Sequence, residues 1–291
     1  MSTVRKVDAV VSSPPMHWVG DGFPVRSVFS PQTPRVKLSP YILMDYAAPA
    51  QFPPASEPRG VGSHPHRGFE TVTVVYQGEI VHRDSAGNGG RIGPGDVQWM
   101  TAARGVLHEE KHSPELTRRG GTVEMAQLWV NLPARDKLSP PRYQTLERDR
   151  IPTIELEDAG GSVRLIAGEL RGQRGAAETF TPVVLWDAAL RKGARVSLPV
   201  PEGFSMAVYV RSGALHVAGT HPLAASQLAT FERSGTELLL EAPDDDAALL
   251  VIGGQPIDEP VVAYGPFVMN TLEEIAQAMA DFQSGRLGEL E

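Results

Sequence analysis

Residues 70–82, which read Glu-Thr-Val-Thr-Val-Val-Tyr-Gln-Gly-Glu-Ile-Val-His, decide the fold class of this chain. The β-branched and aromatic run Thr71–Tyr76 favours a strand, and Gln77-Gly78 is typical of a tight turn into a second strand. A similar turn, Arg211-Ser-Gly213-Ala, lies between strand-like runs in the second half of the chain. This weak internal repeat predicts an all-β protein with two β-sandwich or β-barrel domains.

A polar, proline-bearing stretch at residues 132–152 separates the two halves. Its composition is typical of a connection and not of a buried element. We therefore expect an N-terminal barrel over residues 1–135, a linker over 136–155 and a C-terminal barrel over 156–291. The glycine-rich residues 84–95 are expected to form a loop within the first barrel.

A single helix is strongly indicated, close to the C-terminus. Thr271 and Glu274 have the spacing of a capping box, and Ile275, Met279 and Phe282 follow at helical spacing. We expect this short helix to pack on a barrel and to carry no chemistry.

The composition restricts the classes of function. The 291 residues include 29 Gly and 25 Pro, which favour short strands and many turns, and the net charge of −8 argues against nucleic acid and anionic membranes as partners. No apolar run reaches the ~18 residues of a membrane span, and the N-terminus lacks the apolar core of a signal peptide. A soluble cytoplasmic protein is therefore expected. With no cysteine, any metal must be held by His, Asp or Glu side chains and water.

Two histidine motifs have the spacing of metal ligands. In His64-Pro-His66 both imidazoles share one face of an extended chain, and in His108-Glu-Glu-Lys-His112 the two histidines share a face with Glu110 but not with Glu109. A His-x-His pair alone is often only a polar strand face, but the second motif favours a divalent metal with open positions for substrate or dioxygen. Such a centre would favour an anionic oxygen ligand such as an enolate. His82 is either close to this centre or exposed to solvent.

Longer motifs around these histidines resemble those of the pirin family, which belongs to the cupin superfamily. The resemblance covers residues 20 to 288 and is carried by His64-Pro-His-Arg-Gly-Phe-Glu-Thr-Val-Thr73, Gly95-Asp-Val-Gln-Trp-Met-Thr-Ala102, Arg104-Gly-Val-Leu-His-Glu-Glu110 and Glu259-Pro-Val-Val-Ala-Tyr-Gly-Pro-Phe-Val-Met-Asn-Thr271. It implies two cupin β-barrels (double-stranded β-helices) stacked face to face, with a C-terminal helix.

The resemblance also implies one mononuclear divalent metal in the N-terminal barrel. Carried over by position, the ligands are His64, His66, His108 and Glu110, and iron(II) is the expected metal, with Mn, Co, Ni, Cu or Zn as alternatives. Glu70, which stands where other cupins have a glutamate ligand, is expected not to bind the metal.

We expect the second barrel to be free of metal. Counting back from Gly213 as from Gly78 places Pro199 and Pro201 at the positions of the two histidines, and proline has no side-chain ligand atom. His216 and His221 have no partner motif there and are expected to be structural.

The function implied by the resemblance is the opening of a flavonol such as quercetin by O2 with release of carbon monoxide. Glu110 is the candidate catalytic base. Four apolar residues are candidates either for the pocket wall or for plain core packing: Phe69, Trp99, Met100 and Met44. The alternative is a non-enzymatic, iron-dependent regulatory protein that binds a transcription factor or a metabolic enzyme. A cupin isomerase or sugar-binding barrel shares the fold but not these motifs. The expected partners are a small flavonol-like or enolate substrate with O2 and a possible protein partner, and the chain is expected to be a monomer.

Overall fold

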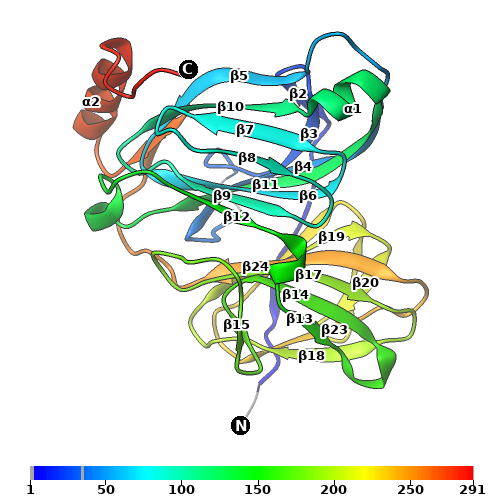
Figure 1. Cartoon of the computed structure of the whole chain (residues 1–291). Coiled ribbons are helices and arrows are strands. Elements are labelled where there is room, and N and C mark those ends of the chain that lie inside the picture. Colours follow the sequence, from blue (N-terminus) through cyan, green and yellow to red (C-terminus); the bar gives the residue numbers. More distant parts are fainter. Residues whose placement is uncertain (1–2, 34–35, 291) are drawn as a thin grey trace. The chain divides into compact units, whose positions relative to one another are not determined.

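The computed structural model describes residues 3–33 and 36–290, so the predicted domain limits at residues 1 and 291 lie outside the described part. Nearly all the regular structure is β-strand, and the strands form two barrels (Figure 1). Within the described residues, the first barrel comprises residues 15–27, 42–148 and 257–290. The second barrel comprises residues 3–14, 28–33, 36–41 and 149–256. The predicted all-β fold with two β-barrel domains and a short C-terminal helix is confirmed.

Each barrel pairs a seven-stranded sheet with a four-stranded sheet. In the first barrel, the larger sheet has the order β12 (Arg142–Leu146), β9 (Val97–Thr101), β6 (Phe69–Gln77), β11 (Gly121–Asn131), β4 (Tyr41–Phe52), β3 (Phe23–Phe29) and β2 (His17–Val19). Its smaller sheet has the order β5 (Gly60–His66), β10 (Val106–His112), β7 (Ile80–Asp84) and β8 (Gly89–Ile92).

The second barrel repeats this plan strand for strand. Its larger sheet has the order β1 (Val7–Ser12), β22 (Gln227–Phe231), β19 (Ser205–Ser212), β24 (Ala247–Gly254), β17 (Val183–Leu190), β14 (Gly161–Ala167) and β13 (Thr153–Glu155). Its smaller sheet has the order β18 (Arg195–Pro199), β23 (Glu237–Glu241), β20 (Ala214–Val217) and β21 (His221–Ala224).

Short elements complete the described chain. They are the hairpins β15 (Glu169–Leu170) with β16 (Gln173–Arg174) and β25 (Val262–Tyr264) with β26 (Phe267–Met269), the helices α1 (Pro114–Arg119) and α2 (Leu272–Gln283), and the 3-10 turns Ala134–Asp136, Arg148–Arg150 and Glu157–Ala159. In the described residues no helix has both the length and the apolar character needed to cross a membrane.

The predicted linear domain limits are wrong at both ends. β1 pairs with β22 of the second barrel, where it takes the sheet position that β12 takes beside β9 in the first barrel. The predicted linker over 136–155 is not a free connection, because it supplies the edge strands β12 and β13. A strand at the edge of a sheet exposes unpaired backbone groups. β12 pairs with the backbone of β9, and β13 pairs with the backbone of β14. The predicted loop over residues 84–95 also contains a strand, β8, which pairs with β7.

The helix α2 is confirmed, with both hydrogen bonds of the predicted capping box between Thr271 and Glu274. Its assignment to the C-terminal barrel is wrong, because the segment after residue 256 belongs to the first barrel. Its buried side chains pack in a cluster with β26 and with Leu107 of β10. An ion pair of 2.8 Å between Asp281 and Arg67 adds a polar contact beside β5.

Candidate metal centre

Adjacent strands bring three histidines together in the first barrel. β5 carries His64 and His66, β10 carries His108, and His64 pairs directly with His108 across the two strands. Alternate residues of β10 are buried, so His108, Glu110 and His112 share the inner face, as their spacing predicts, and Glu109 does not. The sheet register, and not proximity along the chain, therefore assembles this cluster.

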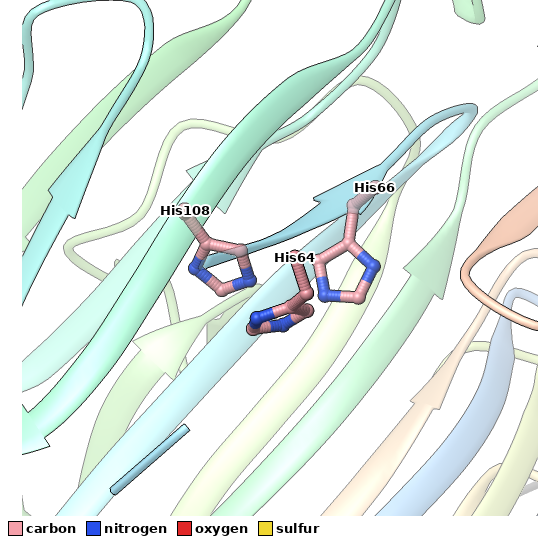
Figure 2. Close-up of side chains that lie close together, drawn as sticks. All are labelled: His64, His66 and His108. Carbon is pink, nitrogen blue, oxygen red and sulfur yellow. The ribbon is translucent and has the colours of Figure 1, made fainter. Parts of the chain in front are cut away.

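The three imidazoles face one another (Figure 2). Their ring centroids lie 4.2 Å apart for His64 and His108 and 4.8 Å apart for each of the other two pairs. One ligand nitrogen from each ring lies within 4.8 Å of the other two. Since metal–nitrogen bonds are ~2 Å long, donors around one ion lie at most ~4 Å apart, and small side-chain adjustments would bring these nitrogens to one ion.

The hydrogen bonds of these rings leave a nitrogen free for a metal. Nδ1 of His64 lies 2.8 Å from the Gly62 carbonyl and Nδ1 of His66 lies 3.4 Å from the Pro266 carbonyl. A carbonyl only accepts, so both Nδ1 atoms carry a proton, and a ring with a single proton then has its lone pair on Nε2. Metal-bound histidines in proteins generally donate their second ring N–H in this way.

His108 gives the most direct test of fit. Its Nε2 is buried and has no hydrogen-bond partner among the described residues, although such atoms are nearly always partnered. Burial, with a smaller effect from the neighbouring imidazoles, holds the pKa of both His108 and His66 well below the usual histidine value. Both rings are therefore neutral, which is the form that binds a metal. The donor set fits a divalent first-row ion.

Glu110 lies beside this cluster but does not join the group of His64 and His66. Its carboxylate accepts hydrogen bonds from Gln98 Nε2 at 2.8 Å, Gln127 Nε2 at 2.9 Å and Thr73 Oγ1 at 3.1 Å. It belongs instead to a second group of potential ligand atoms, with His82 and His108, again within 4.8 Å of one another. One His/Glu cluster in the first barrel could thus bind a metal, with Glu110 held at its inner side.

The amide cradle of Glu110 was not predicted from the sequence. Gln98 on β9 and Gln127 on β11 have the appearance of ordinary polar strand residues, and only the alternation of each strand indicates that they point inward. Tyr143 donates to Gln98 Oε1 at 3.1 Å, which turns the amide NH2 of Gln98 toward Glu110. Burial raises the pKa of Tyr143 to about 12, so the phenol remains a donor.

An aromatic pair lines the other side of the cluster. Phe69, a predicted wall residue, packs edge-on against His66 at 5.0 Å, and Trp129 does the same at 5.2 Å. Trp129 was missed by sequence reasoning, although it alternates with Gln127 on β11. Its indole N–H and the Thr71 hydroxyl are buried without a hydrogen-bond partner in the described residues, and they pair across β11 and β6. Both can donate to a ligand oxygen.

The other predicted residues have different neighbours. Met100 packs with Val106 and Tyr143 in a small cluster, and Trp99 pairs with Val72 on the neighbouring strand. Met44 is fully buried in the core. Glu70 belongs to neither ligand group; it accepts from the Thr101 hydroxyl at 2.7 Å. Nε2 of His112 lies 3.0 Å from the Gly22 carbonyl oxygen, and the ring packs between Phe23 and Phe52.

Both halves of the chain match models of one protein family. Residues 22–130 match the model described as Pirin, and residues 185–288 match the model described as Pirin C-terminal cupin domain. The chain is a member of the pirin family. The resemblance seen in the histidine motifs is thereby confirmed.

Relatives of this chain include proteins named as quercetin dioxygenases and proteins that have only the family name. The Pseudomonas aeruginosa protein named "Putative quercetin 2,3-dioxygenase PA2418" is 54% identical over 97% of this chain and 98% of its own length. Human Pirin is 37% identical over 86% of this chain and 83% of its own length. A crystal structure described as quercetin 2,3-dioxygenase from Acinetobacter baumannii is 50% identical, with a TM-score of 0.96, and the match covers 99% of this chain and 100% of that chain.

Proposed function

We propose that the protein is a metal-dependent dioxygenase that opens a flavonol such as quercetin with O2 and releases carbon monoxide. The single observation that carries the proposal is the buried, unpartnered Nε2 of His108, which lies beside the imidazoles of His64 and His66. The names of the close relatives from Pseudomonas and Acinetobacter support the substrate class. Iron(II) is the proposed metal, and when bound it would supply a Lewis acid and a common template for substrate and O2.

In this proposal His64, His66 and His108 hold the metal through Nε2, and Glu110 is the fourth ligand. All four side chains come from β5 and β10, two paired strands of one sheet, which suits a preorganised centre. His64 is partly exposed whereas His66 and His108 are buried, so the open side of the centre lies toward His64. A substrate would enter there, with Phe69 and Trp129 beside its rings.

Glu110 has a second proposed role, as the base that takes the proton of the flavonol 3-hydroxyl. Three hydrogen bonds, from Gln98, Gln127 and Thr73, hold its carboxylate in place. It would have to leave Gln98 and Gln127 to accept the proton. The side-chain amides of Gln98 and Gln127 would hold the Glu110 carboxylate between turnovers. The Thr71 hydroxyl and the Trp129 indole N–H are candidate donors to the substrate oxygens.

The test compares the turnover of quercetin in air by two Fe(II)-loaded variants, in which Glu110 or its neighbour Glu109 is replaced by alanine. Quercetin consumption is followed by its absorbance, and carbon monoxide is measured in the same sample. We expect Glu110→Ala to lose about 100-fold or more in rate, as for the loss of a general base that is also a ligand. Glu109→Ala is the matched control, because Glu109 faces outward and pairs with Arg83 and Lys111.

Two outcomes would contradict the proposal. Wild-type protein with bound iron and no quercetin loss would exclude this substrate and favour the regulatory role. Equal turnover by both variants would remove Glu110 from the reaction.

A further inference from the structure

A line of three side chains runs from His108 away from the other two histidines. His108 Nδ1 lies 3.4 Å from His82 Nδ1, and His82 Nε2 lies 3.3 Å from a carboxylate oxygen of Asp84. All three side chains are buried. His82 and Asp84 come from β7, which pairs with β10, so the line crosses two adjacent strands of one sheet.

Asp84 is fixed in place by its own loop. One of its oxygens accepts from the backbone N–H groups of Ala86 and Asn88, at 2.9 and 3.0 Å, and both accept from the Asn88 amide. Burial would raise the pKa of Asp84, but the hydrogen bonds from His82 and Asn88 outweigh it and hold the pKa below its ordinary value. The group is thus an ionised carboxylate, which only accepts hydrogen bonds.

The acceptor at Asp84 sets the tautomer of each imidazole in turn. His82 must donate from Nε2 to this acceptor, and a ring that carries a single proton then accepts at Nδ1. The neighbouring Nδ1 of His108 must then be the donor, and the lone pair of His108 is left on Nε2. That atom is the one without a partner beside His64 and His66.

We propose that His82 and Asp84 are positioning residues that fix the tautomer and ring orientation of His108 for metal binding. The inference rests on the proposed metal site. It differs from the arrangement at His64 and His66, whose Nδ1 atoms face backbone carbonyls. For His108, the tautomer is set by the Asp84 carboxylate, which acts through the imidazole of His82.

The ring of His82 is held on its flat face as well. Tyr143 stacks on it, with centroids 4.8 Å apart and planes 18° apart. Gly90 pairs with His82 across β7 and β8, and a Cβ at Gly90 would collide with the Tyr143 hydroxyl. The absence of a side chain at Gly90 leaves the room for this stack.

His82, His108 and Glu110 also have the spacing of a second metal group. Their hydrogen bonds argue against that use. Both ring nitrogens of His82 have hydrogen-bond partners, so His82 has no free ligand atom. The atom left free in the cluster is on the opposite side of the His108 ring, at Nε2.

The test measures Co(II) affinity of the metal-free full-length protein by competition with a chromogenic chelator. His82→Phe keeps a flat ring for Tyr143 but removes the acceptor for His108. Asp84→Asn offers an amide N–H to His82 and so permits the opposite tautomer, as the same change does at the catalytic histidine of serine proteases. We expect each change to weaken Co(II) binding about 10- to 100-fold. In His82→Asn the amide oxygen can occupy the position of the imidazole Nδ1, so this variant should bind Co(II) more tightly than His82→Phe does.

His112→Phe is the matched control, because His112 is a buried histidine of the same barrel that touches no proposed ligand ring. A second readout is the exchangeable ring N–H signals in the proton NMR spectrum of the Co(II) protein. Loss of the His82 acceptor should move one signal and speed its exchange with solvent, and a merely structural role would not. A change in fold stability alone would show in thermal unfolding and leave the remaining signals in place.

The outcomes separate the two proposals. If wild-type protein does not retain Co(II), the metal site fails and the positioning role fails with it. If wild-type protein binds Co(II) and both His82→Phe and Asp84→Asn bind it equally well with unchanged N–H signals, only the positioning role is overturned. Where His82→Phe does not fold, Asp84→Asn decides the question by the same two readouts.

Discussion

The two barrels share one strand plan and differ in what fills it. In the first barrel, Thr73 on β6 pairs with Gln127 on β11, and both side chains lie in the cradle of Glu110. The corresponding strands of the second barrel pair Val208 with Val251, and both belong to a large apolar core. The same fold therefore supports a polar interior in one copy and an apolar interior in the other.

The comparison extends to the proposed ligands. His82 and Val217 each lie four residues after their turn glycines, and His82 pairs with Glu110 where Val217 pairs with Leu240. Leu238 then occupies the place of His108. At these positions one barrel has groups that can bind a ligand, and the other has apolar side chains that stabilise the fold.

The same register corrects one sequence prediction. The count from Gly213 places Pro199 at the first histidine position, but Leu238 pairs with Leu198, and Pro199 points outward. The inward residues are Leu198 and Val200, because the connection between β18 and β19 is longer than that between β5 and β6. Both side chains are apolar and cannot bind a metal, so the metal-free second barrel stays a prediction with a different physical basis.

The largest expected effect is on metal content. It compares the two barrels by replacing one histidine in each of them with alanine. We expect His66→Ala to lose nearly all bound iron, since it removes one of three clustered imidazoles. His216→Ala, in the second barrel, should leave the iron content unchanged. Iron per protein is measured after reconstitution and desalting. Full iron content in His66→Ala would break the site assignment, and loss of iron in His216→Ala would show that the second barrel also binds metal.

Much of this site could be predicted from local sequence because β-strands alternate strictly. The period of two places His108 and Glu110 on one face and Glu109 on the other, and it needs no knowledge of the partner strand. The sequence could not indicate that β1 joins the second barrel or that α2 joins the first, because strand order does not say which sheet edge is open. Nor could it single out Gln98, whose importance depends on a contact with Glu110 from another strand.

The next effect concerns the free energy of unfolding, and here the larger loss is expected from the change in the second barrel. Leu238 is fully buried in the apolar core, and Leu238→Ala should lower the free energy of unfolding by about 2–5 kcal/mol, because it leaves a cavity. His108→Ala at the matching position should cost metal-free protein less, since it also removes a buried nitrogen that has no partner. Urea unfolding of the metal-free proteins measures both. A larger loss for His108→Ala would contradict the division between a stabilising interior and a binding interior.

The smallest effect concerns a buried carboxyl with no counterpart in the second barrel. Burial raises the pKa of Glu70 from 4.5 to about 7, and the hydrogen bond from Thr101 only partly opposes this. Below about pH 4.5 the group is protonated in both the folded and the unfolded chain. Between about pH 4.5 and 7 only the unfolded chain has lost the proton, so stability falls as the pH rises through this range.

Glu70→Gln removes the ionisable group and keeps an acceptor for Thr101. We expect the variant to match the wild type near pH 4.5 and to exceed its free energy of unfolding by about 3 kcal/mol above pH 7. Ser205→Ala is the control: Ser205 is the buried residue at the same place on β19, and it does not titrate. A difference between Glu70→Gln and wild type that stays constant from pH 4.5 to 8 would mean that Glu70 is ionised in the folded barrel. The carboxylate would then be balanced by a nearby cation, for which Arg142 is the candidate.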